Sequence, residues 1–88
     1  MDVKQAAEMA RSQLREITGL NPVTVTKTFK DEQGWHVAID VLEMSRIPPA
    51  TDVLGDYDLL LDDNGNLISF DRKRMRLRGE AGERIKAP

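Results

Sequence analysis

The sequence predicts a small two-layer α+β domain, in which one N-terminal helix packs on a four-stranded antiparallel β-meander. Hydrophobic residues recur every three to four positions up to about residue 18, and at every second position from about residue 23 onward. The dipeptide Asn64-Gly65, which favours a tight hairpin turn, lies between two of the alternating segments.

The helix is expected over about Val3–Thr18. Its apolar stripe consists of Val3, Ala6, Ala7, Ala10, Leu14 and Ile17. Asp2 can cap the first turn, and Gln5 can complete a capping box. At the other end, Gly19 suits the left-handed position after a helix, and Pro22 prevents continuation.

The first two strands are expected to form a hairpin around residues 31–34. If Gly34 takes the left-handed position of a three-residue loop, Phe29 lies opposite Val37 and Val25 lies opposite Val41. All four apolar side chains then share one face of the sheet.

The second hairpin follows the bend at Pro48-Pro49, where proline interrupts strand pairing. A third strand is expected over about residues 53–62 and a fourth over about 66–77, joined by Asn64-Gly65. The register of a two-residue turn pairs Leu61 with Ile68, Leu59 with Phe70, and Tyr57 with Arg72.

One sheet face is the expected destination of the helix stripe. It carries Val25, Phe29, Val37, Ile39, Val41, Tyr57, Leu59 and Leu61. Residues 1–79 are therefore expected to form a single domain. Residues 80–88 combine glycine, alanine and charged residues around one isoleucine, and are expected to be a flexible tail.

Composition limits the classes of function. The 88-residue chain has no cysteine, which excludes a disulfide framework, thiol catalysis and a cysteine-based zinc site. No apolar run approaches the roughly 20 residues of a transmembrane helix, and the first residues lack a secretory signal pattern. We expect a soluble cytoplasmic protein.

Residues with catalytic or metal-binding chemistry are few. His36 is the single histidine, and it alternates away from the core face with no candidate nucleophile or substrate pocket nearby. The acidic segment at residues 62–66 superficially resembles a calcium loop, but its spacing is wrong and strands flank it. We expect no catalytic residue, no cofactor and no metal.

The charge pattern near the C-terminal strand is the most distinctive chemical feature. Every charged residue from Asp52 to Asp71 is acidic, and the following residues are mostly basic. Alternation predicts that Arg72, Arg74, Arg76 and Arg78 share one side of the strand. The predicted register also places Asp56 opposite Lys73 and Asp58 opposite Asp71.

Two interpretations of the arginine row stay open. Arginines in a row can bind carboxylates, phosphates or acidic protein surfaces. Equally, charge on an edge strand protects it from aggregation.

The sheet face away from the helix is expected to be partly apolar and uncovered. Its residues are Ala38, Leu42, Met44, Leu54, Leu60, Leu67 and Met75, interleaved with Asp40, Asp58 and Asp71. Because contiguous exposed apolar surface marks interfaces, Leu42, Met44, Leu54 and Leu60 are candidates for a self-association face that would form a homodimer.

Several motifs resemble the gas vesicle protein O family. They include Gly34-Trp35-His36-Val37, Val41-Leu42-Glu43-Met44, Arg46-Ile47-Pro48, Thr51-Asp52-Val53-Leu54, Tyr57-Asp58-Leu59, Leu61-Asp62 and Gly65-Asn66-Leu67. The resemblance covers about residues 2–79, and residues 43–57 are its most specific part.

This resemblance implies a non-enzymatic accessory protein of gas vesicle assembly, an adaptor or chaperone-like partner of other gas vesicle proteins. Such a protein would be cytoplasmic or associated with gas vesicles. The candidate contact residues are Arg72, Arg74, Arg76, Arg78, Arg46, Asp52 and Tyr57. The alternative is a small nucleic-acid-binding regulator that uses the basic strand, although the chain is acidic overall and only Phe70 is placed for base stacking.

Overall fold

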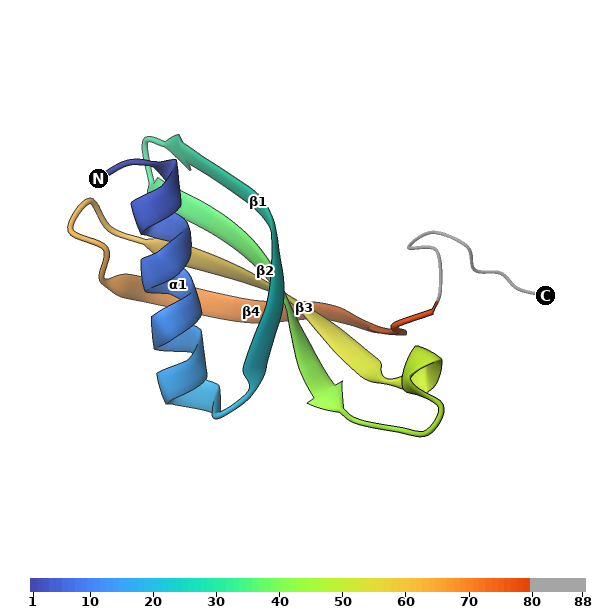
Figure 1. The fold of residues 1–88 in the computed structure, drawn as a ribbon. Coiled ribbons are helices and arrows are strands. Elements are labelled where there is room, and N and C mark those ends of the chain that lie inside the picture. Colours follow the sequence, from blue (N-terminus) through green and yellow to red (C-terminus); the bar gives the residue numbers. More distant parts are fainter. Residues whose placement is uncertain (80–88) are drawn as a thin grey trace.

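The fold is one α-helix packed against a four-stranded antiparallel sheet in the order β1-β2-β3-β4 (Figure 1). The computed structural model describes residues 1–79, so the expected tail at 80–88 lies outside the described residues. The elements are α1 (Val3–Thr18), β1 (Asn21–Asp31), β2 (Gly34–Met44), the 3₁₀ helix η1 (Pro49–Thr51), β3 (Val53–Leu61) and β4 (Leu67–Leu77). The predicted fold class is confirmed.

Helix α1 begins and ends through the predicted local contacts. The Asp2 carboxylate accepts a hydrogen bond from the Gln5 backbone at 2.8 Å, and the Gln5 side chain accepts one from the Asp2 backbone at 3.0 Å. At the other end, Gly19 has a φ of 74°, which favours glycine. The stripe is narrower than predicted, because Val3 and Ile17 are exposed.

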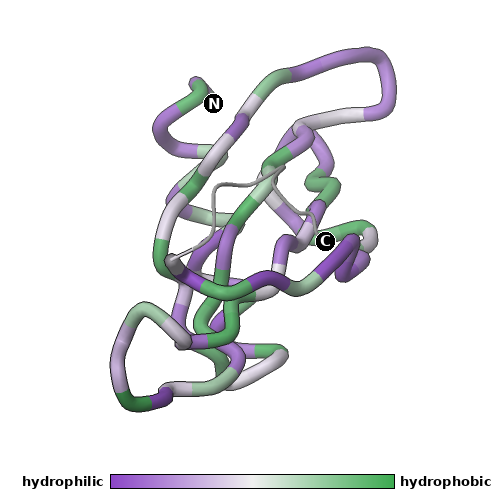
Figure 2. The backbone as a smooth tube through the Cα atoms, turned by 90° about the vertical axis from the view of Figure 1, so that its right-hand side faces the viewer, coloured by the Kyte–Doolittle hydropathy of each residue, from purple (hydrophilic) through white to green (hydrophobic). Residues whose placement is uncertain are grey.

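The core lies between the middle of α1 and the facing side of the sheet. Its buried members are Ala6, Ala10, Leu14, Trp35, Val37, Ile39, Val41, Tyr57, Leu59 and Leu61. Hydrophobic and hydrophilic stretches alternate along much of the backbone (Figure 2). Each large apolar side chain buried in this way contributes about 1.5–3 kcal/mol of transfer free energy.

The β1–β2 hairpin differs from its prediction. Asp31 pairs with Gly34, which leaves a two-residue turn, and a register shift follows Val25. Phe29 therefore lies opposite His36 on the face away from α1, where it is 42% exposed and its ring stacks on the imidazole at 4.6 Å. The prediction that Phe29 belongs to the core is wrong, because a β-bulge reverses the alternation along β1.

Bulges also change the other expected pairings. Leu59–Phe70, Tyr57–Arg72 and Asp58–Asp71 are confirmed. The observed pairs Leu61–Leu67, Asp56–Arg74 and Val25–Ile39 replace the predicted Leu61–Ile68, Asp56–Lys73 and Val25–Val41. One extra residue in one strand of a pair is enough to shift every later partner.

The helix covers only one end of the sheet. The other end, which carries η1 and the last residues of β4, extends past α1 (Figure 1), and we call it the distal end. We call the sheet face opposite α1 the open face. Among the described residues, no helix has the length and apolar character needed to cross a membrane.

Candidate functional site

Four arginines near the end of the chain each contact a carboxylate, and we call this set the arginine ladder. The pairs are Arg72–Glu43 at 3.5 Å, Arg74–Asp56 at 2.8 Å, Arg78–Asp52 at 3.1 Å, and Arg76–Asp40. Each positive charge is thus balanced within the chain. The ladder presents alternating charge and not an uninterrupted positive stripe.

The ladder is divided between the two faces of the sheet. Arg72 lies opposite Tyr57, on the side of α1, whereas Arg74 lies opposite Asp56 on the open face. Lys73 stands between them as the extra residue of a bulge. The prediction that all four arginines share one side is therefore wrong.

Tyr57 belongs to the core and does not lie on an accessible surface. Its hydroxyl donates a hydrogen bond to Glu43 Oε2 at 3.1 Å, and burial together with this carboxylate raises the pKa of the phenol. Glu43 lies across Gly55, where an added Cβ would overlap its carboxylate. Glu43 was not predicted to take part; its only signal in the sequence is a charge that interrupts an apolar run.

Asp52 joins the proline bend to the end of β4. The buried carboxylate accepts hydrogen bonds from the Arg46 backbone at 2.7 Å and from Arg78 Nε at 3.1 Å. The Asp52 carbonyl also accepts one from the Arg78 backbone at 2.8 Å. Asp52 therefore anchors the distal end.

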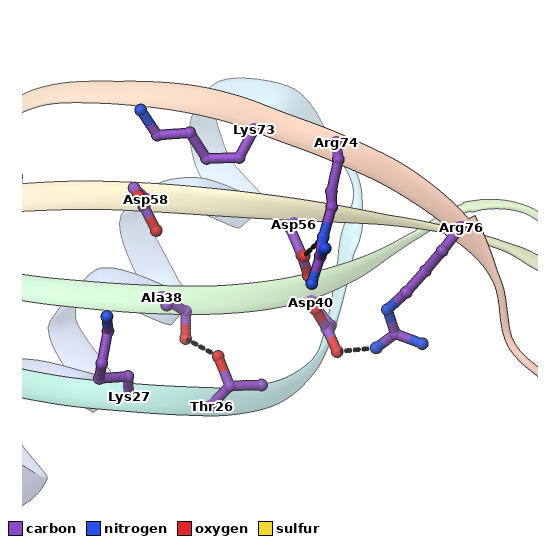
Figure 3. Close-up of a pocket in the computed structure, with 9 residues that line it drawn as sticks. All are labelled: Thr26, Lys27, Ala38, Asp40, Asp56, Asp58, Lys73, Arg74 and Arg76. Carbon is purple, nitrogen blue, oxygen red and sulfur yellow. Dashed lines mark hydrogen bonds and ion pairs between the residues drawn. The ribbon is translucent and has the colours of Figure 1, made fainter. Parts of the chain in front are cut away.

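The open face carries a shallow depression of about 640 Å³ (Figure 3). It is lined by Thr26, Lys27, Ala38, Asp40, Asp56, Asp58, Lys73, Arg74 and Arg76. Side chains from all four strands meet here, and both acidic and basic groups line it (Figure 3).

Two carboxylates lie directly opposite each other in this depression. Asp40 on β2 pairs with Asp56 on β3, and Arg76 reaches Asp40 from β4. Burial and the neighbouring Asp56 raise the pKa of Asp40 to about 6, against the opposing effect of Arg76. The hydrogen bond with Asp40 lowers the pKa of Asp56, and Arg74 lowers it further. Asp40 Oδ1 is buried and has no hydrogen-bond partner among the described residues.

These groups are suited to charge-matched binding. Within residues 1–79, no set of three or more histidine or carboxylate side chains could hold a metal ion. His36 contacts Asp31 at 2.9 Å and stacks on Phe29, the arrangement of an ordinary strand histidine. The segment at 62–66 forms a turn in which the Asp62 carboxylate accepts backbone hydrogen bonds from Asn64 and Asn66.

The residues predicted for self-association are only partly on the open face. Leu42 and Leu60 are half-buried there, and Leu54 is buried. Met44 lies past the bulge at Glu43 and pairs with Val53, on the side of α1. Two further residues expected on the open face, Leu67 and Met75, also lie on the side of α1, because they pair with Leu61 and Gly55.

Three of the exposed large apolar side chains of residues 1–79 lie at the distal end. Met44 is 56% exposed, Ile47 is 96% exposed and Met75 is 49% exposed. Two of the predicted contact residues, Arg46 and Arg78, are exposed there and joined by Asp52. A third, Arg72, is exposed nearer the middle of the sheet and contacts Glu43, next to Met44. We call these six residues the distal surface.

Comparison with known proteins identifies relatives along most of this chain. The family model described as "Gas vesicle synthesis protein GvpO" matches residues 1–82. Gas vesicle protein O of Streptomyces sp. (strain CB03234) is 35% identical over 72 residues, which are 82% of this chain and 56% of that protein. Gas vesicle protein O1 of Halobacterium salinarum is 25% identical over 59 residues, 67% of this chain and 50% of that protein.

A third relative, gas vesicle protein O of Haloferax mediterranei, is 25% identical over 52 residues, 59% of this chain and 37% of that protein. The chain spans about half the length, or less, of the curated relatives it matches. No solved structure matches it. The family model covers the helix and all four strands, and this chain belongs to the gas vesicle synthesis protein GvpO family.

Proposed function

We propose that this chain acts in gas vesicle formation by binding other gas vesicle proteins, as an adaptor or chaperone-like factor. Membership of the GvpO family supports the cellular role. The observation that carries the binding mechanism is the distal surface, where exposed apolar side chains lie beside exposed arginines.

The composition of the distal surface is that of a protein interface. Methionine and arginine are enriched in interfaces, and methionine adapts to differently shaped partners. Ile47 stands at the tip of the bend and is 96% exposed, so its side chain contributes almost nothing to the core. Because Asp52 fixes the backbone of Arg46 next to it, the isoleucine is presented from an anchored segment.

The predicted contact residues divide into two groups on this proposal. Arg46 and Arg78 would contact the partner, since they are exposed at the distal end, and the exposed Arg72 would join them beside Glu43. Asp52 and Tyr57 are buried and would hold those residues in position. Arg74 and Arg76 line the depression on the open face and would not take part.

The experiment is a tagged pull-down from a gas-vesicle-forming bacterium that lacks its own GvpO-family gene. We expect the parent chain to restore vesicles and to co-purify with other gas vesicle proteins. Ile47→Glu combined with Met44→Glu should abolish both effects, because charged side chains cannot enter an apolar contact. Ile17→Glu is the matched control, since Ile17 is similarly exposed on α1.

Two results would contradict the proposal. One is a distal variant that stays folded and still co-purifies with the same gas vesicle proteins. The other is a parent chain that restores vesicles without co-purifying with any of them. The nucleic-acid alternative gains no support from the arginine ladder, whose charges are already paired with carboxylates, and a low-salt gel shift tests it directly.

A further inference from the structure

The middle of the open face carries four acidic and four basic side chains. The acidic ones are Asp40, Asp56, Asp58 and Asp71, and the basic ones are Lys27, Lys73, Arg74 and Arg76. Arg74 and Arg76 are paired with Asp56 and Asp40. The remaining two lysines and two aspartates form no ion pair with any residue of the described chain.

The strand register places three of these charges on one line across the sheet. Lys27 pairs with Ala38, Ala38 pairs with Asp58, and Asp58 pairs with Asp71. From β1 to β4, this line therefore carries a positive side chain, a small apolar one and two negative ones. The two aspartates face each other, which is unfavourable unless a cation from elsewhere approaches them.

A two-fold axis parallel to the strands, midway between β2 and β3, would exchange β1 with β4 and β2 with β3. Lys27 of one copy then meets Asp71 of the second copy, and this contact occurs twice. Ala38, which has the smallest side chain on the line, faces Asp58 of the second copy and leaves room for it.

On one side of this line, the same axis places Asp40 of each copy against Asp56 of the other, and these carboxylates are paired with Arg76 and Arg74 of their own chain. The line on the other side is compatible with this symmetry. Phe29 pairs with His36, His36 with Leu60, and Leu60 with Ser69. The same axis puts Leu60 against His36 of the second copy and Phe29 against Ser69. The exposed Phe29–His36 stack would then be covered by apolar and small side chains.

We propose that two copies of this chain pack open face to open face about such an axis, with Lys27 of each copy paired to Asp71 of the other. Strands of nine to eleven residues at about 4.8 Å spacing and 3.3 Å per residue give a face of roughly 600–700 Å². Two such faces together reach the roughly 1,200–2,000 Å² of a stable interface.

Face-to-face sheets lie about 10 Å apart with strand directions within about 30°. A lysine side chain from one sheet can reach an aspartate of the other over that separation. This inference goes beyond the proposed function and uses a different surface. The distal surface remains uncovered in the paired arrangement, so the tests of the two proposals are independent.

The test measures the molar mass of the full chain by sedimentation equilibrium from about 1 to 200 µM. We expect a dimer that weakens with added salt, because the cross-copy ion pairs are screened. Lys27→Glu alone and Asp71→Lys alone should each weaken dimerisation at least tenfold. Mixing these two variants should restore a one-to-one dimer, since both contacts in the mixed pair are again between opposite charges.

Lys4→Glu is the matched control, because it makes the same charge change on exposed α1 and should leave the dimer unchanged. Circular dichroism of each variant establishes that it is folded. A parent chain that stays monomeric at 200 µM would overturn the proposal. So would a dimer that both single reversals leave intact, or two weakened variants that fail to associate when they are mixed.

Discussion

The buried carboxylate of Asp40 should make the stability of this protein depend on pH in an unusual direction. Asp40 is 4% exposed and lies opposite Asp56. Burial, reinforced by Asp56, raises its pKa from 3.8 to about 6. A raised pKa means that the folded state binds the proton more tightly than the unfolded state, so the protonated form of Asp40 favours folding.

The magnitude follows from the two pKa values. The stabilising contribution is fully present below about pH 4 and is lost as the pH rises through about 6. The interval from 3.8 to about 6 corresponds to a loss of up to about 3 kcal/mol in the free energy of unfolding. The pKa of Asp56 is lowered, so ionisation of Asp56 favours the folded state and opposes this loss. We therefore expect the free energy of unfolding to fall by about 1–3 kcal/mol in total.

Asp40→Asn should remove this loss. Asparagine has nearly the same shape, carries no charge, can accept a hydrogen bond from Arg76 and can donate one to Asp56. Relative to the parent chain, the variant should gain about 1–3 kcal/mol of unfolding free energy between pH 4 and pH 8. Urea denaturation followed by fluorescence measures this, because Trp35 is the single tryptophan and is buried in the core.

The matched control is Asp58→Asn, which removes an exposed carboxylate from the same face. It should change the unfolding free energy by less than about 0.5 kcal/mol across the same pH range. The reasoning would be refuted if the difference between Asp40→Asn and the parent chain did not vary with pH. It would also be refuted if that variant lost more than about 2 kcal/mol at pH 8, the result expected when a buried ion pair is strongly stabilising.

Three further substitutions test the fold by the same denaturation measurement. Gly34→Ala should cost more than about 2 kcal/mol, because φ is 138° and an added Cβ would overlap the Leu61 carbonyl oxygen; an unchanged midpoint would contradict this. Leu14→Ala should cost about 2–5 kcal/mol by opening a cavity under α1, and Ile17→Ala on the exposed side of the helix is its control. Asp52→Ala should cost about 1–3 kcal/mol, because it leaves the Arg46 backbone amide without its acceptor, and a loss below about 0.5 kcal/mol would show that the bend holds without it.

Local signals were sufficient for the helix and for the number of strands. The capping box at Asp2 and Gln5 and the glycine at 19 act within one turn of chain, so sequence spacing determines them. The change from a helical period to alternation likewise depends only on neighbouring residues. These features were predicted correctly because no distant contact is needed to form them.

The register was harder to predict, because a bulge leaves almost no trace in the sequence. An unbroken period of two was assumed along β1 and β4, whereas the structure inserts extra residues in both. Phe29 and Met75 were therefore assigned to the wrong faces. The Arg76–Asp40 pair, which crosses from β4 to β2, could not be predicted while the register was wrong.

The candidate surfaces are uncovered because the single helix is smaller than the sheet. A 16-residue helix is about 24 Å long and 10–12 Å wide, whereas four strands of up to eleven residues span roughly 36 Å by 19 Å. One helix cannot cover even a single face. Beyond the part of the sheet that α1 covers, Glu43 accepts a hydrogen bond from Tyr57 and pairs with Arg72. These polar contacts take the place of apolar packing and remain stable next to water.

This replacement explains why the ladder arginines are poor evidence of function when taken alone. Each one balances a carboxylate, and several of those carboxylates are half-buried or buried, so neutralising charge within the fold already accounts for these arginines. Ile47, Lys27 and Asp71 are exposed, and the charges of Lys27 and Asp71 form no ion pair among residues 1–79, although Lys27 lies over the Phe29 ring. Features that stability does not require are the better guide to binding, and the tests of the two proposals therefore change Ile47, Lys27 and Asp71 and leave the ladder arginines in place.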